Sequence, residues 1–171
     1  MARMVRNPLN PQITPHHYER HVGDVIEAWI NTPGALKSLF KHLLPDREIL
    51  QSLEGLRLNR TTSEKPHWQG ASGYQHQIDE SFTTDDERVI VLIECKHWSN
   101  TIDIPAFSTF LIRLVDIAMK DQGRTVLGIL ATTQGPQGRF GGTDDDQDCI
   151  AKLQTYFSSI GCPIAIQWLP D

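Results

Sequence analysis

Long apolar runs alternate along the chain with segments whose apolar residues recur at helical spacing. The runs 89–95 and 125–132 carry almost no polar interruption, which is typical of strands buried on both faces. Residues 15–30, 103–118 and 144–158 place apolar side chains three or four positions apart, as helices that pack on a sheet do. Strand, helix and strand in succession favour a right-handed parallel crossover.

The remaining segments are shorter or less regular. Residues 36–44 predict a short helix, 49–62 a strand bent at Gly55, and 163–168 a final strand. Residues 61–73 are punctuated by proline and glycine and predict a loop. We therefore expect an α/β fold, with a mixed central sheet, an antiparallel hairpin at its centre and helices on both faces.

Two segments lie outside this alternation. Residues 1–14 carry Asn-Pro pairs and predict an extended N-terminal arm, which leaves 15–171 as a single domain. Residues 133–142 are glycine-rich but lack the Gly-Lys-Ser/Thr ending of a phosphate-binding loop, which excludes a nucleotide triphosphatase of that type. They are either a loop that contacts substrate through Gln134 or Arg139, or a plain connector.

Charged residues interrupt the apolar pattern at the end of a predicted hairpin, which spans residues 75–96. Side chains alternate along a strand, so Gln77 and Asp79 share one face of the first predicted strand. For the same reason Glu94 and Lys96 share one face of the second strand. Antiparallel pairing across the polar turn between the strands brings Asp79 near Glu94.

Two carboxylates at the end of an apolar hairpin repel each other unless a cation lies between them. Oxygen ligands select a hard ion, so Mg²⁺ or Mn²⁺ is the expected metal for Asp79 and Glu94. Such an ion polarises a phosphate and lowers the pKa of a bound water, which Lys96 can orient. This combination is the chemistry of phosphodiester hydrolysis. The rival interpretation is a surface hairpin with a Glu94–Lys96 ion pair, which contributes little stability.

An Asp, a hairpin and Glu-x-Lys after an apolar run resemble the signature of the PD-(D/E)xK nuclease superfamily, whose fold is restriction-endonuclease-like. The Gln-Ile-Asp strand followed by the Ile-Glu-Cys-Lys strand is similar to its Mrr-type branch. The resemblance implies that Asp79 and Glu94 bind the metal with help from the Cys95 backbone carbonyl. It also implies that Lys96 is catalytic.

The first predicted helix carries a second match. Its Tyr18-Glu19-Arg20-His21-Val22 stretch resembles the first-helix motif of the Mrr-type enzymes, which implies that Glu19 supports the metal site. The alternatives are that Glu19 is an exposed acid near a positive helix end, or that Glu27 takes this role. Gln77, alongside Asp79, is a candidate contact to water or substrate.

Composition and net charge add only a few constraints to this prediction. The chain has 171 residues, 16 basic and 21 acidic, and a net charge of −5, which argues mildly against holding nucleic acid by electrostatics alone. Three cysteines without Cys-x-x-Cys spacing indicate reduced thiols. No run resembles a signal peptide or a membrane span, so we expect a cytoplasmic protein. Basic residues could still gather in a local patch that binds nucleic acid. The candidates are Arg3, Arg6, Arg57, Arg60, Lys65, Arg113, Lys120, Arg124 and Arg139.

These features and the resemblance together predict a Mg²⁺-dependent endonuclease, a phosphodiester hydrolase whose partner is DNA. The resemblance covers the chain from Tyr18 to about Ile166 and leaves no separate specificity domain. A homodimer or a partner subunit is therefore the expected source of target choice. Two alternatives stay open: a nuclease-fold module that binds nucleic acid or a protein without cutting, and an RNA-directed nuclease.

Overall fold

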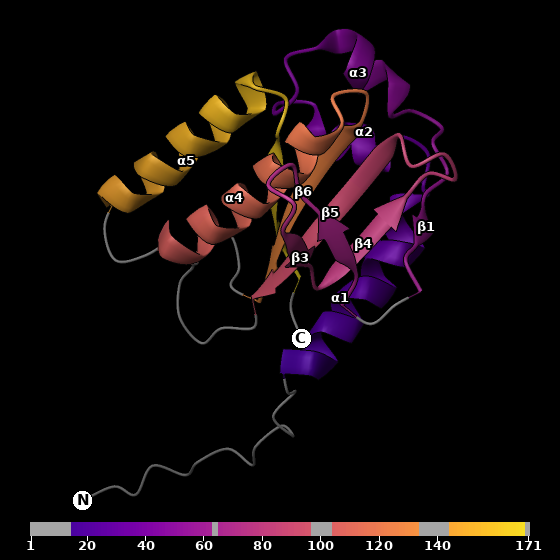
Figure 1. The fold of residues 1–171 in the computed structure, drawn as a ribbon, viewed down its shortest axis with the longest axis horizontal. Helices are drawn as coiled ribbons and strands as arrows, with labels where there is room; N and C mark the ends of the chain where they lie inside the picture. The colour runs from indigo at the N-terminus through magenta and orange to yellow at the C-terminus, as the bar shows by residue number, and fades with distance from the viewer. Residues whose placement is uncertain (1–14, 63–64, 97–103, 134–143, 170–171) are drawn as a thin grey trace, which may run out of the picture.

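A five-stranded mixed sheet forms the centre of the molecule (Figure 1). The computed structural model describes residues 15–62, 65–96, 104–133 and 144–169. The strands run in the order β1-β4-β5-β6-β7, with antiparallel pairing from β1 to β5 and parallel pairing from β5 to β7. The strands are β1 (Asn59–Arg60), β4 (Glu80–Thr83), β5 (Val89–Lys96), β6 (Thr125–Thr132) and β7 (Ile164–Trp168).

Helices cover both faces of this sheet. Odd-numbered residues of β5, such as Val91 and Ile93, pack into one hydrophobic cluster, and even-numbered residues, such as Ile90 and Leu92, pack into another. The first cluster includes side chains of α1 (Pro15–Ile30) and α2 (Ala35–Phe40), with α3 (Arg47–Ser52) packed beside it. The second includes α4 (Ile104–Lys120) and α5 (Asp144–Ser159). The predicted α/β fold with a mixed sheet and an antiparallel β4–β5 hairpin is confirmed.

The predicted strand over residues 75–82 is interrupted, which corrects the sequence interpretation. β3 (Gln75–Gln77) pairs with β2 (His67–Gln69) in a separate two-stranded sheet, and β4 begins only at Glu80. The break occurs at Ile78, whose amide donates to the Pro66 carbonyl at 2.9 Å. The predicted loop at 61–73 therefore contains a strand.

The strand predicted over residues 49–62 is also wrong for most of its length. Asp46 caps a short helix, because its Oδ1 accepts hydrogen bonds from the amides of Glu48 at 2.8 Å and Ile49 at 3.2 Å. Gly55 follows in a left-handed conformation with φ +77°, which reverses the chain. Asn59 and Arg60 pair with β4, and the Thr61 amide adds one hydrogen bond to the Ser81 carbonyl at 2.9 Å.

A carboxylate of α4 is one of the points that attach the β2–β3 hairpin to that helix. Asp116 accepts hydrogen bonds from the Ser72 amide at 2.9 Å and the Ser72 hydroxyl at 2.6 Å, and it lies 2.6 Å from His76 Nε2. A side chain at Gly70 would collide with this carboxylate, since a Cβ there lies 1.9 Å from Asp116 Oδ2. These bonds hold the pKa of Asp116 at about 2, with the Ser72 hydroxyl as the largest cause.

Several predictions fall on residues outside the described ranges. They are the arm at 1–14, most of the glycine-rich segment at 133–142, and the contacts proposed for Gln134 and Arg139. Within the described ranges, no helix is long and apolar enough to cross a membrane. Cys95 and Cys162, both described, are buried free thiols.

Candidate active site

The charged end of β5 forms the first half of the site. Lys96 Nζ lies 2.8 Å from Glu94 Oε1, which confirms that the two side chains share a face of the strand. Glu94 is buried, with 6% of its surface exposed. Arg113 of α4 adds a second cation, because its Nη1 lies 3.2 Å from Glu94 Oε2 and 3.3 Å from Oε1. The carboxylate of Glu94 is therefore neutralised by two basic side chains.

Asp79 forms the second half of the site, just before β4. Glu80 pairs with Ile93 in the β4–β5 ladder, so Asp79 comes beside Glu94, as antiparallel pairing predicts. The Cys95 amide donates to Asp79 Oδ2 at 2.8 Å. Burial, followed by the negative charge of Glu94, raises the pKa of Asp79 to about 6. Among the described residues no hydrogen bond to its other oxygen, Oδ1, is found, so that oxygen is open to a ligand.

Glu19 reaches the site from the other side of the sheet. It lines a cavity of about 340 Å³ together with Asp79 and with Lys65, whose Nζ lies 3.5 Å from Glu19 Oε1. Its charge also raises the pKa of Asp79, though less than burial and Glu94 do. The rival acid, Glu27, instead pairs with Arg60 at 3.3 Å. The structure thus brings Glu19, rather than Glu27, into electrostatic contact with Asp79.

Gln77 takes a different position from the one expected on a continuous strand. Because β3 ends at Gln77 and β4 begins after Asp79, strand alternation does not relate the two side chains. Gln77 is exposed. Its contact with the site runs through its backbone carbonyl, which accepts a hydrogen bond from Arg113 Nη1 at 3.4 Å.

Sequence reasoning missed the roles of two arginines. Arg113 is predicted only as a candidate for a local basic patch, yet it binds Glu94. Arg60 is predicted only as part of a basic patch, yet it lines the cavity and binds acids on two elements. No local sequence signal marks these partners, because Arg113 is 19 residues from Glu94 and Arg60 is 36 residues from Asp24. Lys65 and Arg124, from the same predicted patch, are also paired with acids.

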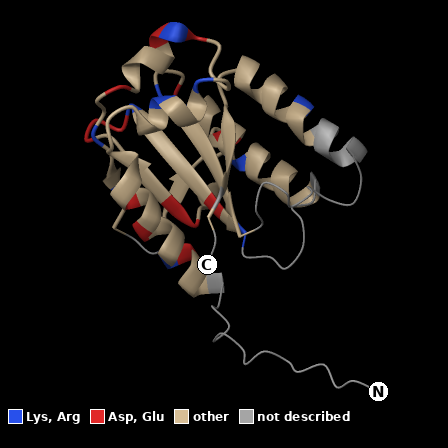
Figure 2. Ribbon diagram, turned by 180° about the vertical axis from the view of Figure 1, so that it is seen from behind, with Lys and Arg blue, Asp and Glu red and all other residues tan. Residues whose placement is uncertain are grey.

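Acidic side chains gather at this end of the sheet. Figure 2 shows Asp and Glu on α1 and on the strands beside it. The thiol of Cys95 lies among them, and burial followed by the charge of Asp79 raises its pKa well above the usual value. This thiol is therefore protonated at neutral pH, which makes its sulfur a poor metal ligand and a poor nucleophile.

The donor set fits a hard divalent cation that keeps water or substrate oxygens as further ligands. Among the described residues, no three side chains of His, Cys, Asp or Glu form a metal-binding group. Mg²⁺ is commonly held by one or two carboxylates together with waters and substrate phosphates rather than by a full protein cage. The open oxygen of Asp79 and the negative charges around it match that kind of site.

Comparison with known proteins yields only distant likenesses. No family model and no curated protein matches the chain. Similar solved structures include a protein of unknown function, AF1548 (16% identity, TM-score 0.40), SfsA of Pyrococcus furiosus in complex with Ca²⁺ (12%, 0.40) and a repair endonuclease from Pyrococcus abyssi (20%, 0.38). The alignments cover 63%, 84% and 78% of this chain, and 48%, 56% and 47% of those chains. This chain therefore spans about half the length of the structures that it matches.

Proposed function

We propose that this protein is a metal-dependent nuclease of restriction-endonuclease-like type that hydrolyses phosphodiester bonds in DNA. The observation that carries the proposal is the bond between Asp79 and the Cys95 amide. This bond places a carboxylate of raised pKa beside Glu94 and Lys96, at the end of a buried strand. A carboxylate that lines a cavity and has a pKa raised by burial and a neighbouring charge is a candidate functional group.

In this proposal Asp79 and Glu94 hold Mg²⁺ or Mn²⁺, with the Cys95 carbonyl as a further ligand and Glu19 in support. A bound ion of this class polarises the phosphate and lowers the pKa of a bound water. Binding requires the carboxylate of Asp79 to be ionised, and that form predominates above a pH of about 6. The site should therefore bind the metal ion most tightly at neutral or alkaline pH.

The chain's own basic groups complete the proposed chemistry. Lys96 lies 2.8 Å from Glu94 and is 21% exposed at its side chain, so it can turn from that acid to orient water or to neutralise charge on the phosphate. Arg113 contacts both oxygens of Glu94 and keeps that carboxylate in place while Lys96 moves. Gln77, exposed beside the site, is the candidate contact to substrate.

We infer the PD-(D/E)xK superfamily, and its Mrr-type branch, from the motifs alone. DNA is the proposed partner, and target choice is assigned to a second copy of the chain or to another subunit. A second function rests on one observation: Glu94 is already neutralised by Lys96 and Arg113. That arrangement also suits a module that uses the nuclease fold to bind nucleic acid or protein without cutting.

Cleavage assays separate these functions. Wild type, Asp79→Asn and Lys96→Ala are incubated with supercoiled, linear and single-stranded DNA, and with RNA, in Mg²⁺ or Mn²⁺. Lys41→Ala, an exposed lysine at the end of α2, is the matched control. Metal-dependent cutting by wild type and Lys41→Ala that is lost in the other two variants supports the nuclease. Wild type that neither cuts nor binds Mn²⁺ favours the binding module, and cutting of RNA alone reassigns the substrate.

A further inference from the structure

Arg60 makes a two-pronged contact with Glu80, the residue that follows Asp79 in the chain. Arg60 Nε lies 2.9 Å from Glu80 Oε2, and Arg60 Nη2 lies 2.7 Å from Glu80 Oε1. Paired contacts of this geometry fix direction as well as distance, and lysine cannot reproduce them. The two side chains are 21% and 13% exposed, so solvent screens the pair only in part. The start of β4 is thus tied to the edge strand β1.

The same guanidinium lies directly on helix α1. Glu19, Gly23 and Glu27 recur every four residues, and therefore line one face of that helix. A Cβ built at Gly23 would lie 2.0 Å from Arg60 Nη2 and 2.8 Å from Glu80 Oε1. The absence of a side chain at Gly23 is what lets the Arg60–Glu80 pair approach the helix.

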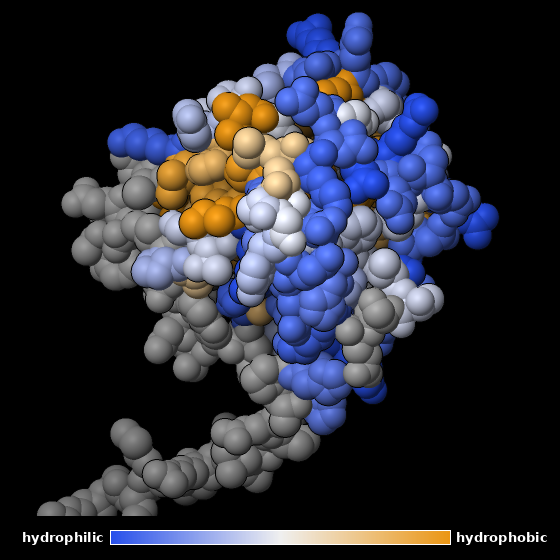
Figure 3. All heavy atoms as spheres, viewed as in Figure 1, coloured by the Kyte–Doolittle hydropathy of each residue, from blue (hydrophilic) through white to orange (hydrophobic). Residues whose placement is uncertain are grey.

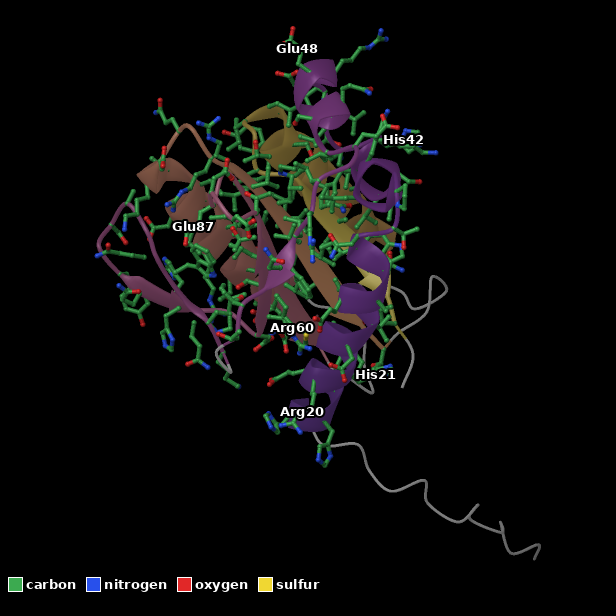
Figure 4. All side chains as sticks on the ribbon, turned by 90° about the vertical axis from the view of Figure 1, so that its right-hand side faces the viewer. Arg20, His21, His42, Glu48, Arg60 and Glu87 are labelled. Carbon is green, nitrogen blue, oxygen red and sulfur yellow. The ribbon has the colours of Figure 1, made fainter. Side chains whose placement is uncertain are left out.

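Two acids of α1 hold the other side of the guanidinium. Arg60 Nη1 lies 2.8 Å from Asp24 Oδ1 and 3.3 Å from Glu27 Oε2, and Figure 4 shows Arg60 beside α1. Both acids are more than half exposed, so these contacts add little stability by themselves. Their effect is to orient the guanidinium between the helix and the strand.

The two anchoring points of Arg60 each adjoin one acid of the candidate site. Glu80 directly follows Asp79, and Gly23 lies one helical turn after Glu19. Arg60, Glu19, Asp79 and Glu80 line the same cavity. We propose that Arg60 is a positioning residue for this site, which sets Asp79 against Glu19 by fixing the start of β4 on α1. The inference deepens the proposed function and rests on it for the role of the two acids.

The test uses two variants that disturb this contact in different ways. Arg60→Lys keeps the charge but loses the paired hydrogen bonds. Gly23→Ala keeps every charge but pushes the guanidinium away, although alanine favours a helix more than glycine does. Arg124→Lys is the matched control, because Arg124 also bridges two acids, Glu87 and Asp121. Glu87 lies well apart from Arg60 in Figure 4.

Two measurements are made on the full chain. The first is the amide resonance of Cys95 in ¹H,¹⁵N NMR without divalent cations, since that amide donates to Asp79 and reports its position. The second is the affinity for Mn²⁺ by titration calorimetry. Arg60→Lys and Gly23→Ala are expected to shift the Cys95 resonance and to weaken Mn²⁺ binding about tenfold, the lower end for residues that support metal ligands. Arg124→Lys should change neither quantity.

The outcomes separate this inference from the proposed nuclease. An unchanged Cys95 resonance in Arg60→Lys overturns the positioning role, whatever the cleavage assays show. A shifted resonance with unchanged Mn²⁺ affinity also overturns it, because the movement then has no consequence for the site. If wild type neither binds Mn²⁺ nor cuts nucleic acid, the nuclease proposal fails, while the Cys95 resonance still decides whether Arg60 positions Asp79. Should Gly23→Ala fail to fold, Arg60→Lys alone decides the question.

Discussion

Asp79 accepts a hydrogen bond from the Cys95 backbone amide at 2.8 Å, and this bond ties the acid that precedes β4 to the charged end of β5. The bond stabilises the ionised form of Asp79, but burial and the charges of Glu94 and Glu19 outweigh it. The result is a carboxyl group with a pKa of about 6. A protein gains no stability from such a group at neutral pH, so its presence favours a functional role.

The first prediction concerns the stability of Asp79→Asn. The pKa of Asp79 is raised from 3.8 to about 6 in the folded chain, so its ionisation destabilises the fold as pH rises through that window. Asn keeps an acceptor for the Cys95 amide without the charge. Without divalent cations, Asp79→Asn should raise the unfolding free energy at pH 7.5 by on the order of 2 kcal/mol, and the gain should vanish below pH 4. Urea unfolding at both pH values measures it.

Asp86→Asn is the opposite-sign control for that experiment. Hydrogen bonds from the Thr84 hydroxyl and the Arg88 amide lower the pKa of Asp86. Its ionised form therefore stabilises the fold at neutral pH, and Asn should lower stability there. A gain in both variants would point to a general effect of removing acids rather than to burial of Asp79.

The second prediction links the metal to the same carboxyl group. A ligand that binds only the folded chain raises its stability with concentration. Mn²⁺ should raise the melting temperature of wild type at pH 7.5 and much less at pH 5, where Asp79 is mostly protonated. Asp79→Asn should show no Mn²⁺ effect at either pH. An equal Mn²⁺ effect in wild type and variant would place the bound ion elsewhere.

The third prediction tests whether Glu94 acts on Asp79 through its charge. Glu94 is the second-largest cause of the raised pKa of Asp79, after burial. Glu94→Gln should therefore lower that pKa below 6 without returning it to 3.8, since the burial remains. Carbon-13 NMR titration of the Asp79 carboxyl measures the change. Glu54→Gln is the control, because Glu54 pairs with Lys37 and is not among the causes of the shift.

The fourth prediction concerns the attachment of the β2–β3 hairpin to α4. The folded pKa of Asp116 is about 2, below its ordinary value of 3.8. Its contribution to stability is present above pH 4 and is lost as pH falls toward 2. Asp116→Ala should speed hydrogen exchange of the Ser72 amide at pH 7, because that amide donates to Asp116 Oδ1. Slow exchange in the variant would show that the hairpin docks without this carboxylate.

Helices α4 and α5 also carry an exposed apolar surface. Figure 3 shows a hydrophobic area over these two helices. Ile112 and Met119 of α4 are 67% and 65% exposed, and Ile160, just after α5, is 51% exposed. Asp116 lies on α4 between Ile112 and Met119, so Asp116→Ala is the variant whose oligomeric state should be checked against wild type. The other substitutions lie outside α4 and α5.

Local periodicity in the sequence is enough to predict the central strand, its hairpin and the long helices. The apolar run of β5 and its alternation placed Glu94 and Lys96 on one face, and the pairing of the hairpin placed Asp79 beside them. Helical spacing predicted α1, α4 and α5 on the same grounds. These features follow from neighbouring residues, since each strand or helix repeats within a few positions.

The breaks in these periods, and the contacts between side chains far apart in the sequence, follow from tertiary packing. The Ile78 amide binds the Pro66 carbonyl in register with the β2–β3 pairing, whereas β4 pairs with β5 only from Glu80, and this change of partner separates Gln77 from Asp79. Arg113 reaches Glu94 only because α4 packs on the face of the sheet that carries the even-numbered residues of β5. Arg60 reaches Gly23 only because β1 joins the edge of the sheet beside α1. Such contacts join residues that are far apart in the sequence, and no local pattern specifies them.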